Sequence, residues 1–300
     1  MRSRLDGCAT RLLLLGIGLL CLAAPAAAED EAATSTTAHE VDTSSTAELS
    51  REFSDPLTAL PQLIVQEIYT PANYGTEAAG NRVLLRAIVP RIPRFTLLPF
   101  VQLLRPTFQL VTVPTGRGSA TRTALGDTQL LHFAALPVHE RLVPDLYVGV
   151  GPVFVFPTAT DELAGQGAWQ VGPAFATLYK GIPGLLLGAL VQNPISFAYT
   201  SPQRRAVSYL SVQPLVLAYV GKGFYVKSAD SSWTFGWHER APTLLPLSFG
   251  IGYVHVREGL PPINLFVSGE WTAYRKNAPV APQASVRFGM TVAFPGLRPW

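Results

Sequence analysis

The fold is decided by the stretch SVRFGMTVAF, residues 285–294. Every second residue from Val286 to Phe294 is large and apolar, and the residues between them are Arg, Gly, Thr and Ala. A period of two residues is that of a β-strand whose two faces meet different surroundings. The stretch therefore predicts a strand with one apolar face.

The same alternation of large apolar residues with small or polar ones recurs in segments such as 167–179 and 81–91. The second face of these segments is rich in Gly, Ala, Ser and Gln, whereas a water-facing sheet usually carries Lys and Glu. A barrel in lipid turns its apolar face outward and its polar face inward, where a tight interior favours small residues. The pattern therefore predicts an all-β protein, an antiparallel transmembrane β-barrel.

We expect about twelve strands, joined alternately by longer polar loops and tight Gly- or Pro-containing turns. An even strand number with short turns on one side is typical of bacterial outer-membrane barrels, and it places both chain ends on the periplasmic side. The predicted strands cover residues 62–70, 81–91, 97–113, 125–136, 145–156, 167–179, 184–197, 206–219, 223–236, 243–256, 260–274 and 281–294.

Composition supports this fold class. Of the 300 residues, 48% are hydrophobic and 14% are charged, below the roughly 25% charged residues of a usual soluble domain. The net charge of +3 and the lack of basic runs interleaved with aromatic residues give no sign of a nucleic-acid partner. A soluble periplasmic β-protein is the alternative outside the membrane.

The first 28 residues have the pattern of a secretory signal peptide. Arginines precede an apolar run over residues 12–22, and three alanines at residues 26–28 form a small-residue cleavage site. The run is shorter than the roughly 20 residues of a spanning helix, although an uncleaved anchor is the alternative. Because Cys8 and Cys21 both lie here, the mature chain is expected to have no disulfide and no thiolate site.

Residues 29–60 are expected to be disordered to partly helical, before a barrel over residues 61–295 and a tail at 296–300. The early part is rich in Thr, Ser, Ala and Glu and has too few large apolar residues to form a core. Ser45 and Glu48 have the spacing of a capping box, which predicts a short helix ending before Asp55-Pro56. A further hypothesis makes the segment from Ser45 to Leu60 a plug for the lumen.

Several charged or polar side chains fall on predicted inward faces. A charge facing lipid at mid-membrane costs about 2–4 kcal/mol for Arg or Lys, so inward placement is favoured. Two interpretations stay open: a lumen that selects solutes by charge, and interior salt bridges that brace the wall. The lumen-facing candidates are Glu67, Arg82, Arg86, Gln170, Glu270 and Arg287.

Catalytic and metal sites find little support in the sequence. The five histidines form no metal-ligand pair such as HExxH, and no GxSxG elbow occurs. A lipid-acting barrel enzyme would need a Ser–His pair; His132 with Ser119 or Ser208 stays open, while His255 and Ser248 differ in strand parity. We therefore predict no enzyme activity, no cofactor and no metal.

Short motifs in a fixed order resemble the outer-membrane proteins of the meta-pathway of phenol degradation, a transporter-like family sometimes mislabelled neuromedin U. The resemblance covers nearly the whole mature chain and implies an outer-membrane barrel that takes up small, often aromatic, compounds. It supplies no substrate residues. The motifs are DPLTAL at 55–60, GDTQ at 126–129, GVGP at 149–152, FPTAT at 156–160, WQVGPA at 169–174, GALVQN at 188–193, SVQP at 211–214, FYVKS at 224–228 and PLSFGIG at 246–252.

The expected function is a passive channel for small apolar or aromatic solutes in the outer membrane. The alternatives are a closed structural barrel without transport and the lipid-acting enzyme. The expected partners are outer-membrane lipid, the barrel-assembly machinery and the solute.

Overall fold

The structure is a computed structural model. It describes residues 45–90, 101–116, 118–138, 142–228, 230–237 and 241–297. The expected signal peptide, residues 29–44 of the segment expected to be disordered to partly helical (29–60), the start of the strand expected at 97–113 and most of the tail at 296–300 lie outside these ranges.

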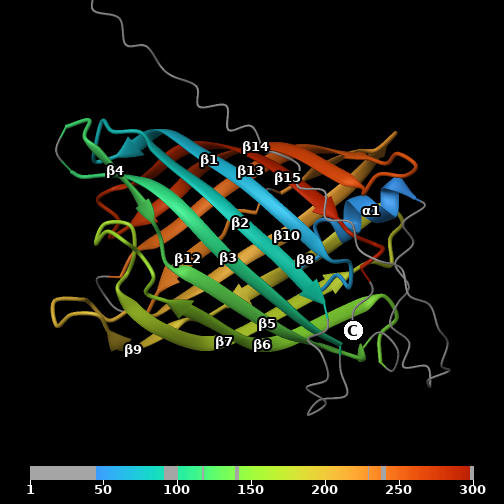
Figure 1. The fold of residues 1–300 in the computed structure, drawn as a ribbon, viewed down its shortest axis with the longest axis horizontal. Helices are drawn as coiled ribbons and strands as arrows, with labels where there is room; N and C mark the ends of the chain where they lie inside the picture. The colour runs from blue at the N-terminus through green and yellow to red at the C-terminus, as the bar shows by residue number, and fades with distance from the viewer. Residues whose placement is uncertain are drawn as a thin grey trace, which may run out of the picture. The chain divides into compact units, whose positions relative to one another are not determined.

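The described chain forms a closed antiparallel β-barrel (Figure 1), as the sequence predicts. The last strand pairs with the first, and pairing between β8 and β10 closes the sheet. The wall has twelve strand positions, which we call staves. Three of them consist of two shorter strands each: β4 with β5, β8 with β9, and β11 with β12. The strands are β1 Gln62–Tyr74, β2 Gly80–Pro90, β3 Val101–Pro114, β4 Thr121–Leu125, β5 Thr128–Leu136, β6 Leu146–Phe156, β7 Ala168–Tyr179, β8 Leu185–Gln192, β9 Ile195–Tyr199, β10 Tyr209–Gly221, β11 Phe224–Lys227, β12 Trp233–Gly236, β13 Thr243–His255, β14 Ile263–Lys276 and β15 Ala281–Ala293.

The divided staves are interrupted where the sequence predicts continuous strands. Asn193-Pro194 separates β8 from β9, because a proline has no N–H to donate to the ladder. Gly126-Asp127 separates β4 from β5, and residues 228–232 separate β11 from β12. The third interruption brings a carboxylate into the lumen, as described below.

The two faces of the wall differ as the alternation predicts. On β15, Phe288 is 53% exposed and Arg287 only 7%. The register carries this difference around the barrel, so that Phe288 lies level with Glu67 on one side and Val267 on the other. Exposed Leu, Val, Ile and Phe side chains cover the outer wall on most staves. Such a band is the surface that a barrel presents to lipid.

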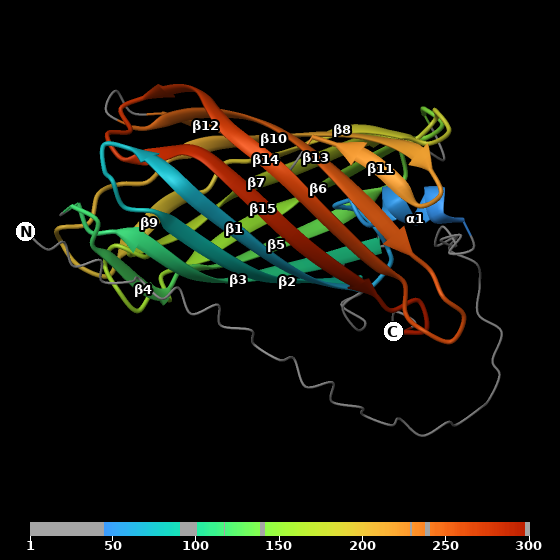
Figure 2. The same cartoon turned by 90° about the horizontal axis from the view of Figure 1, so that it is seen from above.

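The N-terminal segment begins with helix α1, Thr46–Glu52, at the barrel end where β1 starts (Figure 2). The Ser45 side chain caps the helix by accepting a hydrogen bond from Glu48 N at 3.4 Å. This confirms the predicted helix start. Among the described residues, no helix is long and apolar enough to cross a membrane.

Each barrel end carries connections of several lengths, and residues 256–262 form one of the longer connections at the end that holds α1. The end that holds α1 has connections such as 180–184 and 222–223, and we call it the turn end. The opposite end, which we call the loop end, carries residues 115–120, 157–167 and 200–208.

Candidate functional site: a cationic lumen behind an N-terminal plug

Five of the six predicted lumen residues lie on the inner face of the wall. Arg82 and Arg287 lie on either side of Ile68 in the register, two strands apart. Both line a cavity in the lumen, and Arg86 lines it as well. Glu270 Oε2 lies 3.6 Å from Arg287 Nη2. Those four come from β2, β14 and β15. The fifth, Gln170 on β7, is 1% exposed and donates a hydrogen bond to Gln166.

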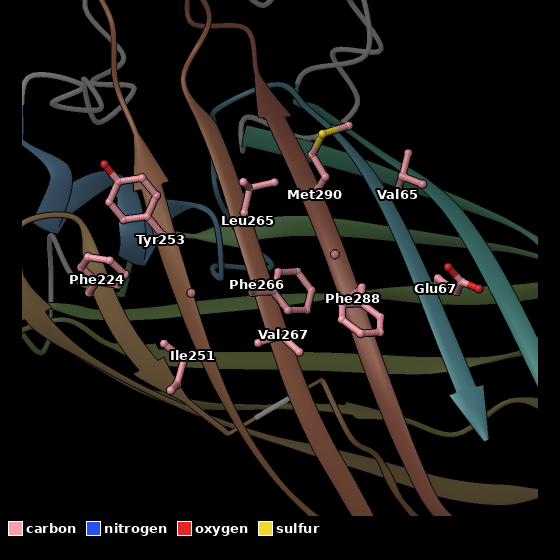
Figure 3. A pocket seen from close by; sticks show the side chains of 12 residues that line it. Val65, Glu67, Phe224, Ile251, Tyr253, Leu265, Phe266, Val267, Phe288 and Met290 are labelled. Atoms are coloured by element: carbon pink, nitrogen blue, oxygen red, sulfur yellow. The ribbon is translucent and has the colours of Figure 1, made fainter. Parts of the chain in front are cut away.

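Glu67, in contrast, lies on the outer face, so its prediction as a lumen residue is wrong. Its neighbours on that face of β1, Leu63 and Tyr69, are 41% and 46% exposed. Glu67 Oε1 accepts a hydrogen bond from Asn81 Nδ2 at 2.9 Å. Figure 3 shows Glu67 next to Phe288 on an open hollow of about 580 Å³ in the outer wall. The hollow is apolar and faces lipid, so it is not the lumen.

The lumen holds a polar cavity of about 280 Å³. Four of its lining side chains are arginines, and two are aspartates. Amides from Gln109, Gln129, Gln192 and Gln213 add hydrogen-bonding groups, and Gln129 Nε2 donates to Gln192 Oε1 at 2.9 Å. The charged lining residues are Arg82, Arg86, Arg105, Arg287, Asp127 and Asp230.

Asp230 comes from the interruption between β11 and β12, and it reaches strands four staves away around the barrel. Its Oδ2 accepts a hydrogen bond from Gln66 Nε2 of β1 at 3.0 Å. It also lies 3.8 Å from Arg287 Nη1 and, through Oδ1, 3.6 Å from Lys227 Nζ. The neighbouring Ser231 hydroxyl donates to Glu270. The interruption therefore folds inward and narrows the lumen.

The arginines of β2 and β3 have no such partners. Among the described residues, neither Arg82, Arg86 nor Arg105 forms a salt bridge. Arg86 Nε donates to the Thr107 hydroxyl at 3.2 Å. Arg105 Nε is buried and has no hydrogen-bond partner in the described part of the chain. The interpretation as interior bracing fits Arg287, and it does not fit these three.

The turn end is filled by the N-terminal segment, as the plug hypothesis expects. Leu49, Phe53, Leu57 and Leu60 are 0%, 7%, 8% and 2% exposed. Leu57 packs so closely on the wall that a Cβ on Gly149 would lie 2.3 Å from its Cδ2. Burying each of these side chains contributes about 1.5–3 kcal/mol. Their partners are inward side chains of the strands, among them Leu103, Leu131, Phe133, Val153, Leu178, Leu186, Leu190, Leu215, Leu217 and Tyr225.

Ion pairs fix the same segment to the turn after β7. Lys180 Nζ lies 2.6 Å from Glu52 Oε1 and 2.6 Å from Asp55 Oδ2, and its side chain is 8% exposed. Burial by itself lowers the pKa of Lys180, but Asp55 and Glu52 raise it by more, so the ammonium stays charged. Burial raises the pKa of Asp55 against the opposing effect of Lys180. The plug therefore carries a buried ion-paired cluster beside its apolar contacts.

Four charged lumen residues, Arg105, Asp127, Lys227 and Asp230, are absent from the predicted set. The alternation of β3 indicates that Arg105 faces the lumen, because it shares a face with Thr107 and Gln109. Phe108 and Leu110 on the opposite face are exposed. Asp230 had no such signal, because it lies in an interruption whose inward fold depends on distant strands.

Of the residues considered for other chemistry, His132 and His255 lie outside the lumen, whereas Ser248 lies on the inner face. His132 Nε2 is 3.0 Å from Gln102 Oε1, and His132 pairs with outward-facing Leu104. Ser248 lies opposite Glu270 on the inner face, whereas His255 is exposed. No group of three or more His, Cys, Asp or Glu side chains within the described ranges is arranged to hold a metal ion.

Comparison with known proteins places the fold. No family model matches the chain, and no curated protein matches it. A solved outer membrane channel, the COG4313 channel from Pseudomonas putida F1, matches with a TM-score of 0.55 at 12% identity, over 78% of this chain and 94% of that chain. The KdgM porin matches with a TM-score of 0.45 at 7% identity, over 78% and 99% of the two chains.

The fold is thus that of outer-membrane β-barrels. The apolar outer wall, the polar lumen and the antiparallel closure are the features of that class.

Proposed function

We propose that the chain is a passive channel for small solutes in the outer membrane. The observation that carries the proposal is a polar cavity of about 280 Å³ inside a closed barrel whose outer wall is apolar. The amide and guanidinium groups around this cavity are not needed to pack the wall. They can replace the water molecules that hydrate a solute as it passes through.

The plug sets the state of this channel. Because Leu49, Phe53, Leu57 and Leu60 fill the turn end, the docked segment closes the lumen, and conduction requires it to move. The turn end faces the periplasm in this proposal, and the chain reaches the membrane through a cleaved signal peptide and the barrel-assembly machinery.

The apolar or aromatic solutes implied by the family resemblance remain the proposed substrate class, with one restriction from the geometry. The lining is mostly polar, so an aromatic solute that carries a polar group fits the cavity better than a hydrocarbon does.

A closed structural barrel is the second candidate, because the same plug is held by apolar contacts and by ion pairs. Single-channel recording in planar bilayers separates the two, using the full mature chain and a variant that lacks residues 45–60. Conduction that appears or rises when the plug is removed supports the channel. A variant without the plug that inserts, shifts on an unboiled gel as a closed barrel does, and still conducts nothing supports the structural barrel.

A further inference from the structure

Positively charged side chains outnumber negatively charged ones on the lining of the lumen cavity. Arg82 and Arg86 lie four residues apart on β2, and Arg105 lies on the neighbouring β3. None of the three forms a salt bridge among the described residues, and Arg105 Nε is buried without a hydrogen-bond partner there. Arg82 is exposed to the lumen, and Arg86 and Arg105 are half-buried, so these guanidinium groups are accessible to an anion that enters the lumen.

The carboxylates of the lumen are already engaged elsewhere. Asp230 is shared by Arg287 and Lys227, and Glu270 lies against Arg287. Asp127, at the loop side of the cavity, accepts backbone N–H hydrogen bonds from residues 159 and 166 with its two oxygens. Four arginines therefore line the cavity with two aspartates, and the excess charge belongs to β2 and β3.

The cavity also has an apolar part. Ile68, Leu84 and Pro194 line it beside the arginines, and Tyr209 adds an aromatic ring. Its volume of about 280 Å³ has room for an organic molecule of several non-hydrogen atoms besides an anionic group. The lining therefore combines a cationic side with apolar contacts, which an inorganic anion alone does not use.

We propose that this cavity is a binding site for a small organic carboxylate. Its carboxylate would pair with the guanidinium groups of Arg86 and Arg105, which lie on neighbouring strands two register positions apart, and its carbon skeleton would lie against Ile68 and Leu84. Arginine suits this role because its planar donors match both oxygens of a carboxylate. The inference deepens the proposed channel function by naming the solute class, and it rests on that function for the biological role of the site.

Calorimetric titration of the full mature chain in detergent tests the site, with sodium benzoate as the probe and benzyl alcohol as its neutral counterpart. Benzoate is expected to bind, and benzyl alcohol at least 10-fold more weakly. The variant R86Q/R105Q should weaken benzoate binding by about 10- to 100-fold, because it removes charge-assisted hydrogen bonds, which are stronger than neutral ones. The matched control is R257Q, which removes an exposed arginine from the β13–β14 turn.

Each variant is first checked for the gel shift of a folded barrel, and the single variant R105Q serves if the double variant does not fold. Equal affinity for benzoate and benzyl alcohol overturns the proposal, and so does equal weakening by R257Q and R86Q/R105Q. Binding of inorganic phosphate without binding of benzoate also overturns it. The channel is tested separately: a chain that conducts but does not bind benzoate refutes only the site, and one that binds benzoate but never conducts refutes only the channel.

Discussion

Replacing Lys180 by methionine is the sharpest test of how the plug is held. The side chain keeps its approximate length, while Glu52 and Asp55 lose the ammonium that lies 2.6 Å from each of them. Their side chains are 3% and 2% exposed, so water cannot replace the missing ammonium while the plug stays docked.

The expected magnitude follows from the burial of this cluster. Removing one partner of a buried ion pair costs about 3–5 kcal/mol, which corresponds to roughly two to almost four orders of magnitude in the ratio of docked to undocked plug. The barrel itself keeps its strand pairing, because Lys180 follows β7 and belongs to no strand. K180M should therefore leave the barrel folded and shift the plug towards release.

Planar-bilayer recording measures this shift as the fraction of time that a channel is open. The matched control is K222M, which removes an exposed lysine from the turn between β10 and β11 at the same barrel end. The reasoning is refuted if K180M and K222M both behave as the wild type while deletion of residues 45–60 opens the channel. In that case the apolar contacts alone hold the plug.

The same cluster gives a pH dependence whose sign can be worked out. Burial raises the pKa of docked Asp55 above its ordinary value of 3.8. Because the pKa of Asp55 is higher in the docked plug than in the released one, protonation of Asp55 stabilises the docked state. This contribution is complete at a pH below 3.8 and is lost as the pH rises through the pKa of docked Asp55. The raised pKa of Lys180 acts only at alkaline pH. The open fraction should rise as the pH increases from about 4 towards neutrality, and D55N should flatten that rise.

Three further predictions concern packing and the outer wall. F53A removes the ring of a plug side chain that is 7% exposed and leaves a cavity there. It should favour release of the plug by about 3–5 kcal/mol, measured as a larger open fraction. G289A places a Cβ 2.2 Å from the Phe266 ring and should destabilise the barrel by about 1–3 kcal/mol in urea unfolding, whereas G269A, with nothing within 4 Å, should change little. E67L should raise the urea midpoint and leave ion selectivity unchanged; a changed selectivity would place Glu67 in the lumen after all.

The strand pattern could be predicted because the solvent on each side of the wall imposes it locally. Lipid selects large apolar residues at every second position of β15, and the crowded lumen selects the residues between them. Gly289 shows the second effect, because a Cβ there would collide with inward-facing Phe266. Both constraints act on the strand's own residues, so the period of two is readable without knowing the neighbours.

Glu67 shows where this reasoning fails. On β1 the alternation is mixed, since Ile64 faces inward at 6% exposure beside the buried Gln62 and Gln66, while Leu63 faces lipid at 41%. Ile64 borders the small pocket beneath the plug together with Phe53, so its apolar character reflects a segment outside the strand. Because large apolar residues lie on both faces, the alternation does not identify the inward face of β1, and the cost of a charge facing lipid indicated the wrong side for Glu67.

The charges of the barrel interior are divided between two tasks, and no local pattern reveals that division. Glu52 and Asp55 are paired with Lys180 at the turn end, while Asp230 is paired with Arg287 and Lys227 further along the lumen. The arginines of β2 and β3 form no salt bridge among the described residues, because the nearest acids, Asp230 and Glu270, make their short contacts with Lys227 and Arg287. The salt bridges of the plug and those of the lumen thus use different residues, although Arg86 and Arg105 also border the small pocket beneath the plug. K180M should therefore change the open fraction without changing benzoate affinity, and R86Q/R105Q should do the reverse. If either variant alters both readouts by similar factors, the two clusters are coupled and the plug senses the solute.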